Sequence, residues 1–475
     1  MLFNSREFVL FLPAVLAVYY LLPHRAQNRF LLAASIFFYA SWDWRFLAPL
    51  LASTTIDYFC ALKMESSILA GEAPARRKKF LVISLVTNLG LLGFFKYFDF
   101  FSGSMQSLLH GMGFHADLWT LRVILPVGIS FYTFQALSYT IDVYRGEIHA
   151  TPHFFDFLLC VIYFPHLVAG PIQRARSLLP QVVYPRKVTR EQIFEGIHLI
   201  LWGYFQKVVI ADNLSRSTGW IFTDKAPDAF YVLFGTYAFA VQIFCDFSGY
   251  TDIARGVAKL MGFEFMLNFN LPYFAKNSQD FWRRWHISLS TWFRDYLYVP
   301  LGGNRSGAAR VSFNLLITMT IAGLWHGAAW HFVLWGAYHG ALLILHRAMN
   351  PLLSRIAPAS AIGRAGWSAA RILVMFHLTC YGWILFRAPS WPSIVALTRS
   401  LFHGFHVFQP EFAFWILVFS APLVAIQMIQ YFGGKLYFLD YSWIPAEARA
   451  MIYAVFFYLI VFRGGPPQAF IYFQF

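Results

Sequence analysis

Long apolar runs dominate this chain, and short polar or basic stretches separate them. A helix needs about 20 apolar residues to cross a bilayer perpendicular to its plane, so the shorter runs are expected to be tilted, partial or re-entrant. The pattern predicts an all-α polytopic membrane protein, a helical bundle with re-entrant and interfacial helices. The runs cover residues 8–22, 30–42, 46–62, 80–98, 123–141, 193–211, 229–249, 372–386, 412–431 and 448–462.

Residues 280–296 show a different pattern, in which apolar and polar side chains recur with the period of a helix. At 100° per residue, the apolar side chains fall on one third of the helical wheel and the arginines fall opposite. Such a helix is typical of the headgroup plane of a membrane. His286 lies on the border between the two faces, where it could reach inward to a site or bond to a neighbour, and at this margin of an interfacial helix we expect it near water. The apolar face consists of Phe281, Trp282, Trp285, Leu289, Trp292, Phe293 and Tyr296.

The stretch from Val311 to Leu345 contains no formally charged residue and is long enough for one membrane pass plus a return or a buried connection. His326 lies near its middle. Ionisable groups at membrane depth are costly and usually face a protein-lined cavity, so His326 is a functional candidate. The alternative is a neutral imidazole that bonds between helices. His331, His339 and His346 follow without metal-ligand spacing, and we interpret them as structural, with His339 as the likeliest exception.

Composition excludes a soluble protein, because 58% of the residues are hydrophobic, 13% are charged and the mean hydropathy is +0.53. The net charge of +14 arises from basic residues in short loops between apolar runs. Attraction to anionic lipid headgroups and a cytoplasmic bias of positive loops explain that charge without nucleic acid. The cysteines have no metal-like spacing, so we expect no metal site.

Loop charge also predicts the orientation of the chain. The run from Arg76 to Lys79 and the basic stretch 347–371 are expected in the cytoplasm. Counting crossings back from the first of these places the N-terminus outside the cytoplasm. Residues 123–141 carry more polar side chains than lipid contact favours, so we expect them to be buried against neighbouring helices. The apolar part of residues 154–190 is expected to be a re-entrant segment that does not cross the membrane.

The chain has no phosphate-binding P-loop, no G-x-S-x-G serine and no HExxH sequence, which disfavours ATP hydrolysis, serine hydrolysis and zinc proteolysis. A histidine in a water-poor cavity suits general base catalysis, because burial favours the neutral imidazole that accepts a proton. Acyl transfer from a thioester needs little more than this base, an aligned hydroxyl and support for the developing oxyanion.

Two strings, FWRRWHISLSTWFRDYLYVPLGGNR at 281–305 and AGLWHGAAWHFVLWGAYHG at 322–340, resemble those of the membrane-bound O-acyltransferases, most closely the bacterial alginate O-acetylation branch. The resemblance extends over nearly the whole chain. It implies one integral membrane domain, 1–475, with a core at 120–345, a catalytic segment at 280–340 and peripheral helices at 1–119 and 346–475. Supporting strings lie at 125–146, 164–174, 244–256 and in the final FIYFQF.

The resemblance also implies roles for individual residues. His326 is expected to be catalytic and His286 to be the second catalytic histidine. Asp246 has a competing interpretation, a structural ion pair with a nearby basic residue. The candidate substrate-binding residues are Trp325, Trp282, Arg283, Arg284, Asn304, Asp246 and His339.

The function that the resemblance implies is transfer of an acetyl group from cytoplasmic acetyl coenzyme A to an extracytoplasmic polysaccharide, with no bound cofactor. The location is the bacterial inner membrane, in contact with its lipids. The expected partners are periplasmic acetyltransferase-type proteins and the polysaccharide acceptor, which is alginate or a similar exopolysaccharide. Peptidoglycan, cellulose or teichoic acid is the alternative acceptor. A non-catalytic export scaffold or a transporter is the alternative of another class.

Overall fold

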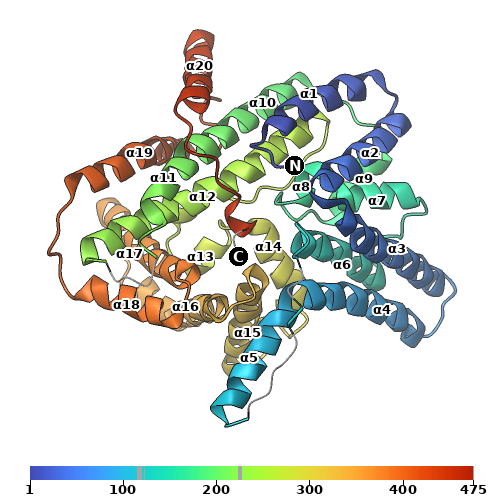
Figure 1. The fold of residues 1–475 in the computed structure, drawn as a ribbon, viewed down its shortest axis with the longest axis horizontal. Helices are drawn as coiled ribbons and strands as arrows, with labels where there is room; N and C mark the ends of the chain where they lie inside the picture. Colours follow the sequence, from blue (N-terminus) through green and yellow to red (C-terminus); the bar gives the residue numbers. More distant parts are fainter. Residues whose placement is uncertain (115–119, 122–123, 223–226, 474–475) are drawn as a thin grey trace. The chain divides into compact units, whose positions relative to one another are not determined.

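The computed structural model describes residues 1–475 except 115–119, 122–123, 223–226 and 474–475. Helices and connecting loops make up the described chain, with no strand in it (Figure 1). Within the described residues, six helical stretches are long and apolar enough to cross a membrane, which confirms an all-α integral membrane protein. They are Pro74–Gly111, Arg190–Thr218, Ala229–Leu260, Ala308–His326, Ala361–Arg387 and Pro410–Gly433.

The chain packs into two compact units, of which the first comprises Met1–Ile200 and Ile253–Met266. Helices α3, α4 and α6 of this unit pack side by side (Figure 1). The helices are α1 (Arg6–Leu21), α2 (His24–Asp43), α3 (Leu47–Leu69), α4 (Pro74–Leu92), α5 (Phe98–Gly111), α6 (Ile129–Arg145), α7 (Phe154–Ile162), α8 (Phe164–Leu167), α9 (Ala175–Val183) and most of α10 (Arg190–Tyr204).

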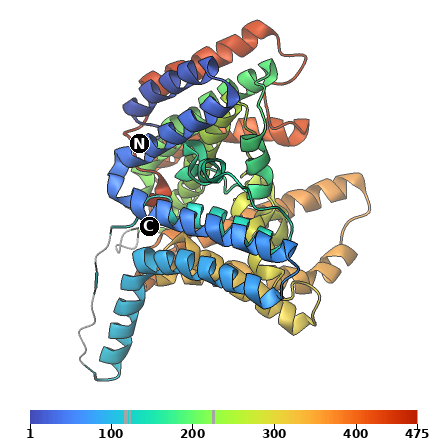
Figure 2. The same ribbon diagram turned by 90° about the vertical axis from the view of Figure 1, so that its right-hand side faces the viewer.

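Helix α6 lies against its neighbours along almost its whole length, with only three of its residues not buried: Ile141, Tyr144 and Arg145. The prediction that this polar-rich run is buried is therefore confirmed. Helices α7, α8 and α9 are each too short to cross a bilayer. The π-helix η2 (Gly93–Tyr97) separates α4 from α5, and Figure 2 shows the change of direction there.

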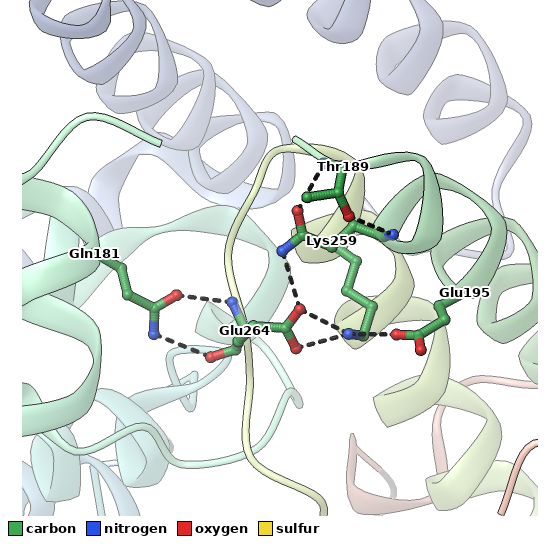
Figure 3. A network of polar contacts seen from close by, with 6 residues as sticks. Gln181, Thr189, Glu195, Lys259 and Glu264 are labelled. Carbon is green, nitrogen blue, oxygen red and sulfur yellow. Dashed lines mark hydrogen bonds and ion pairs between the residues drawn. The ribbon is translucent and has the colours of Figure 1, made fainter. Parts of the chain in front are cut away.

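One polar network ties the end of α12 (Ala229–Leu260) to α9 and α10 within the first unit (Figure 3). The ammonium group of Lys259 lies 2.7 Å from a carboxylate oxygen of Glu195 and 2.7 Å from one of Glu264. Gln181 fixes the Glu264 backbone, because its amide oxygen accepts from the N–H and its amide nitrogen donates to the carbonyl. Thr189 belongs to the same network.

The second unit comprises Leu201–Asp252 and Leu267–Phe475. Helices α15 and α16 form an antiparallel hairpin in it, and of the two helices α15 is a candidate membrane span. Two glycines allow the close approach, since a Cβ on Gly336 would lie 2.2 Å from the Met319 carbonyl oxygen and one on Gly323 3.0 Å from the Gly336 Cα. The helices are α11 (Asp212–Thr218), most of α12, α13 (Ser278–Trp282), α14 (Ile287–Phe293), α15 (Ala308–His326), α16 (Trp330–Arg355), α17 (Ala361–Arg387), α18 (Trp391–Phe402), α19 (Pro410–Gly433) and α20 (Ala446–Phe462).

The prediction of one continuous amphipathic helix over 280–296 is wrong. Helix α13 ends at Trp282, α14 begins at Ile287, and the π-helix η5 (Arg294–Tyr298) follows. The break lies at His286, whose backbone is left-handed with φ 43° and ψ 54°. A side chain with a Cβ rarely adopts this conformation, so the surrounding packing must hold it there.

Candidate active site

A cavity of 880 Å³ lies among α13, α14, η5, α15 and α16 in the second unit. It follows α15 from Leu315 to His326 and α16 from Leu343 to Asn350. Its volume is in the range of sites for drug-sized ligands and cofactors. The lining residues are Gln279, Trp282, Arg283, Ile287, Leu289, Ser290, Thr291, Phe293, Arg294, Tyr298, Asn304, Leu315, Thr318, Met319, Ala322, His326, Leu343, His346, Arg347 and Asn350.

His326 is the last residue of α15, lines this cavity and is only 3% exposed. Aromatic rings surround its imidazole. Ring centroids lie 5.1 Å away for Trp325, 5.0 Å for Trp335, 5.6 Å for Phe386 and 5.4 Å for Tyr472. These rings exclude water from one side of the histidine, while the cavity opens on another. An electrostatic interaction with a developing charge is stronger in such a place than in bulk water.

His286 lies beside His326, with 6.2 Å between the two ring centroids. It is fully buried, so the prediction that it lies near water at the margin of an interfacial helix is wrong. The helix break turns its ring inward, against Phe247 at 4.7 Å. Neither ring nitrogen has a hydrogen-bond partner among the described residues. Burial lowers the pKa of His286 to about 3, which keeps the imidazole neutral at physiological pH.

Basic and polar side chains gather at the other end of the cavity. Arg283, Arg294 and Arg347 are exposed, and all three line it. Asn304 joins two elements there, because its amide oxygen accepts from the Tyr298 hydroxyl at 2.7 Å and from the Arg347 guanidinium at 3.4 Å. The exposed arginines give the cavity a basic mouth, in which Arg294 is paired with Asp295 at 2.7 Å, and the largely apolar remainder of the lining includes His326.

Of the predicted substrate-binding residues, Trp282, Arg283 and Asn304 line the cavity, and the others lie elsewhere. Arg284 forms an ion pair of 2.8 Å with Asp280, the spacing of four residues expected to support a helix, and also donates to a backbone carbonyl. Trp325 packs on both histidine rings.

His339 and Asp246 are both buried away from the cavity lining. His339 is fully buried between Trp282 and Trp335, with ring centroids at 5.2 and 4.9 Å. The Asp246 carboxylate lies 2.5 Å from the ammonium group of Lys207, which matches its alternative interpretation as a structural ion pair.

Sequence reasoning missed several residues of the mouth. His346 and Arg347 were treated as a structural histidine and as part of a basic loop, yet both line the cavity. A usable signal was present, because Leu343, His346, Arg347 and Asn350 follow the spacing of one helical face. Arg294 is one of the arginines that the helical wheel placed opposite the apolar face, yet it also lines the cavity.

Among the described residues, no three or more His, Cys, Asp or Glu side chains lie together in a way that could hold a metal ion.

Comparison with known proteins places the chain in a family. The model of the membrane-bound O-acyltransferase family matches residues 119–386. A protein from Azotobacter vinelandii named "Probable alginate O-acetylase AlgI" is 42% identical over 82% of this chain and 76% of its own length. The peptidoglycan O-acetyltransferase of Helicobacter pylori is 34% identical over 84% of this chain and 80% of its own. The teichoic acid D-alanyltransferase of Bacillus subtilis is 28% identical over 56% of this chain and 69% of its own length.

Proposed function

Because this chain belongs to the membrane-bound O-acyltransferase family and is an integral membrane O-acyltransferase, we propose that it transfers acetyl groups from acetyl coenzyme A to an extracytoplasmic polysaccharide. The observation that carries the proposal is the cavity with a basic mouth and His326 at its inner end. A single domain over 1–475, with its core at 120–345, belongs to the same proposal.

The charge of the mouth supports the donor. Coenzyme A carries phosphate groups at one end and the thioester at the other. Arg283, Arg294 and Arg347 attract the phosphates, since a cleft lined by one sign of charge concentrates ligands of the opposite sign. The apolar side chains between the mouth and His326 leave room for the arm that carries the thioester. Donor binding thereby places the acetyl group beside a buried histidine.

The chemistry at His326 is general base catalysis. An acceptor hydroxyl attacks the thioester carbonyl carbon while a ring nitrogen of His326 takes the hydroxyl proton. The carbon–sulfur bond then breaks, the acetyl ester forms, and the proton passes to the departing thiolate. His286, neutral and 6.2 Å away between centroids, supports the ring of His326 or the acyl group. Trp282 and Asn304 contact the donor, while Trp325, Arg284 and His339 hold the surrounding structure.

The acceptor follows from the relatives. The relative at 42% identity is named for alginate, and the more distant ones for peptidoglycan and teichoic acid. Alginate or a similar exopolysaccharide is therefore the proposed acceptor. Partner proteins of the periplasmic acetyltransferase type receive or direct the acetyl group. Peptidoglycan is the second candidate, because the 34% identity to that relative extends over 84% of this chain.

Acetyl transfer in membrane vesicles tests the function and ranks the acceptors. Vesicles from cells that express the protein with its neighbouring genes receive labelled acetyl coenzyme A and one acceptor: deacetylated alginate, peptidoglycan fragments or teichoic acid. We expect the thioester to be consumed and the label to appear in alginate. If the label appeared only in peptidoglycan or only in teichoic acid, that polymer would replace alginate as the acceptor. Intact thioester with every acceptor would refute acetyl transfer, and a transporter or export scaffold would replace it.

We also propose that the protein lies in the bacterial inner membrane with its N-terminus outside the cytoplasm. The loop before α4, followed by Arg76 to Lys79, then faces the cytoplasm. A cysteine at Ala73, an exposed position, should resist an impermeant thiol reagent in intact cells and react after permeabilisation. A cysteine at Met112, 64% exposed beyond α5, is the control that should react from outside.

The four native cysteines are buried, which keeps background labelling low. Reaction of the cysteine at position 73 in intact cells, with that at position 112 protected, would reverse the proposed orientation.

A further inference from the structure

A group of buried charges that the acyl-transfer site does not use lies in the second unit. The ammonium group of Lys207 is 2.8 Å from Asp212 and 2.5 Å from Asp246, and the side chains are 1%, 2% and 4% exposed. Buried ion pairs contribute little net stability, because desolvation offsets their attraction. Lys207 also belongs to the π-helix η3 (Phe205–Ala211), and π-helical turns occur often at functional sites. Both features call for an explanation other than stability.

The charges bind a segment distant in sequence, residues 464–473. The Asp246 carboxylate accepts the backbone N–H of Ile471 at 2.7 Å, and Lys207 donates to the carbonyl of Gln468 at 3.1 Å. The backbone N–H of Gly465 donates to the Val208 carbonyl at 2.9 Å. Three hydrogen bonds thus fix the 464–473 segment against η3 and α12.

The contact at Gly465 is close enough to require glycine. A Cβ at this position would lie 2.5 Å from the backbone carbonyl carbon of Asp212, so a side chain would push the segment away. The 464–473 segment is therefore seated on the charged cluster by its backbone as well as by hydrogen bonds.

The end of the 464–473 segment reaches the two histidines. The ring of Tyr472 lies 5.4 Å from His326 and 6.5 Å from His286 between centroids. Phe470 packs on Phe247 at 5.6 Å, and Phe247 in turn packs on His286. Phe470 and Tyr472 lie two and four positions after Gln468, so a shift of the anchored backbone moves both rings.

We propose that Lys207 and Asp246 are positioning residues that hold the 464–473 segment so that Tyr472 forms one wall of the histidine pair. Asp246 then acts on the reaction through this segment and not through contact with substrate. The inference of a catalytic effect rests on the proposed acetyl transfer, whereas the anchoring itself can be measured without any activity.

The test measures the anchoring by cysteine labelling of the full-length protein in detergent. Ile471, 3% exposed, is replaced by cysteine, and its rate of reaction with a maleimide is followed. We expect Asp246→Ala to raise this rate ~10-fold or more, since a charge-assisted hydrogen bond is lost. Lys207 keeps Asp212 as its partner in this variant, which favours folding. Asp246→Asn retains an acceptor for the Ile471 N–H and should restore most of the protection.

Glu195→Ala is the matched control. It removes a carboxylate from another partly enclosed lysine, Lys259, which lies in the first unit. Labelling at position 471 should stay at its starting rate. Gly465→Ala is a second test that leaves the charges intact. Its methyl group should clash with the Asp212 backbone, displace the 464–473 segment and raise the labelling rate at position 471.

Turnover is the second readout. Asp246 does not line the donor cavity, so Asp246→Ala should lower kcat while the KM for acetyl coenzyme A stays unchanged. Asp246→Asn should recover much of kcat. Unchanged labelling in both Asp246→Ala and Gly465→Ala would overturn the anchoring. A labelling rate in Glu195→Ala as high as that in Asp246→Ala would overturn it too. Increased labelling with normal kcat would overturn the effect on catalysis. If the unaltered chain transfers no acetyl group while labelling changes as expected, the proposed function fails and the anchoring stands.

Discussion

Alanine at position 326 is expected to abolish detectable acetyl transfer while the protein stays in the membrane at a near-normal level. Loss of a general base commonly lowers the rate ~10²- to 10⁴-fold. His326 lies at the inner end of the donor cavity, and its ring is enclosed by Trp335, Phe386 and Tyr472. Donor affinity should change little, because the basic mouth remains intact. The measurement is kcat and KM for acetyl coenzyme A with purified protein and acceptor.

A second histidine of the same hairpin provides the control for this result. His331 lies five residues beyond His326 and is not part of the donor cavity. His331→Ala should therefore keep most of the turnover. His286→Ala should have a smaller effect than His326→Ala, or should act partly through folding, because removal of a fully buried ring leaves a void beside Phe247. More than about a tenth of normal turnover in His326→Ala would exceed what loss of a general base permits and would contradict the assignment.

Reversing two charges at the mouth, Arg283→Glu with Arg347→Glu, should raise the KM for acetyl coenzyme A ~10-fold or more, with a smaller change in kcat. Both side chains are exposed and line the cavity where the phosphates of the donor are proposed to bind. Attraction at exposed charges weakens with salt, so the unaltered enzyme should also show a KM that rises with ionic strength. Initial rates at several donor and salt concentrations measure both effects.

Arg355→Glu is the matched control for charge reversal. Arg355 is exposed and ends the same helix, α16, but it does not line the cavity. Arg284 is unsuitable for this comparison, because its ion pair with Asp280 supports the fold. An unchanged KM in the double variant, or an equal rise in Arg355→Glu, would remove the arginines of the mouth from donor binding.

Features that depend on neighbouring residues could be predicted from the sequence alone. The charge-free run 311–345 predicted the pass that α15 supplies in the α15–α16 hairpin, and the polar side chains of the run 123–141 predicted the burial seen for α6. In a bilayer every backbone polar group must bond within its own helix, so hydropathy and length suffice to locate helices. The placement of His326 in this hairpin followed from the same pattern.

Which side chains meet at the site depends on tertiary packing, and the sequence pattern did not predict it. The helical period placed His286 near water, whereas packing breaks the helix there and buries the ring beside His326. Tyr472 reaches these histidines across more than 140 residues of sequence, and Arg347 joins the donor mouth 64 residues after Arg283. No local pattern encodes such contacts, because they depend on how helices pack and which buried charges find partners. Asp246 shows this directly: its role depends on Lys207 and on the Ile471 backbone.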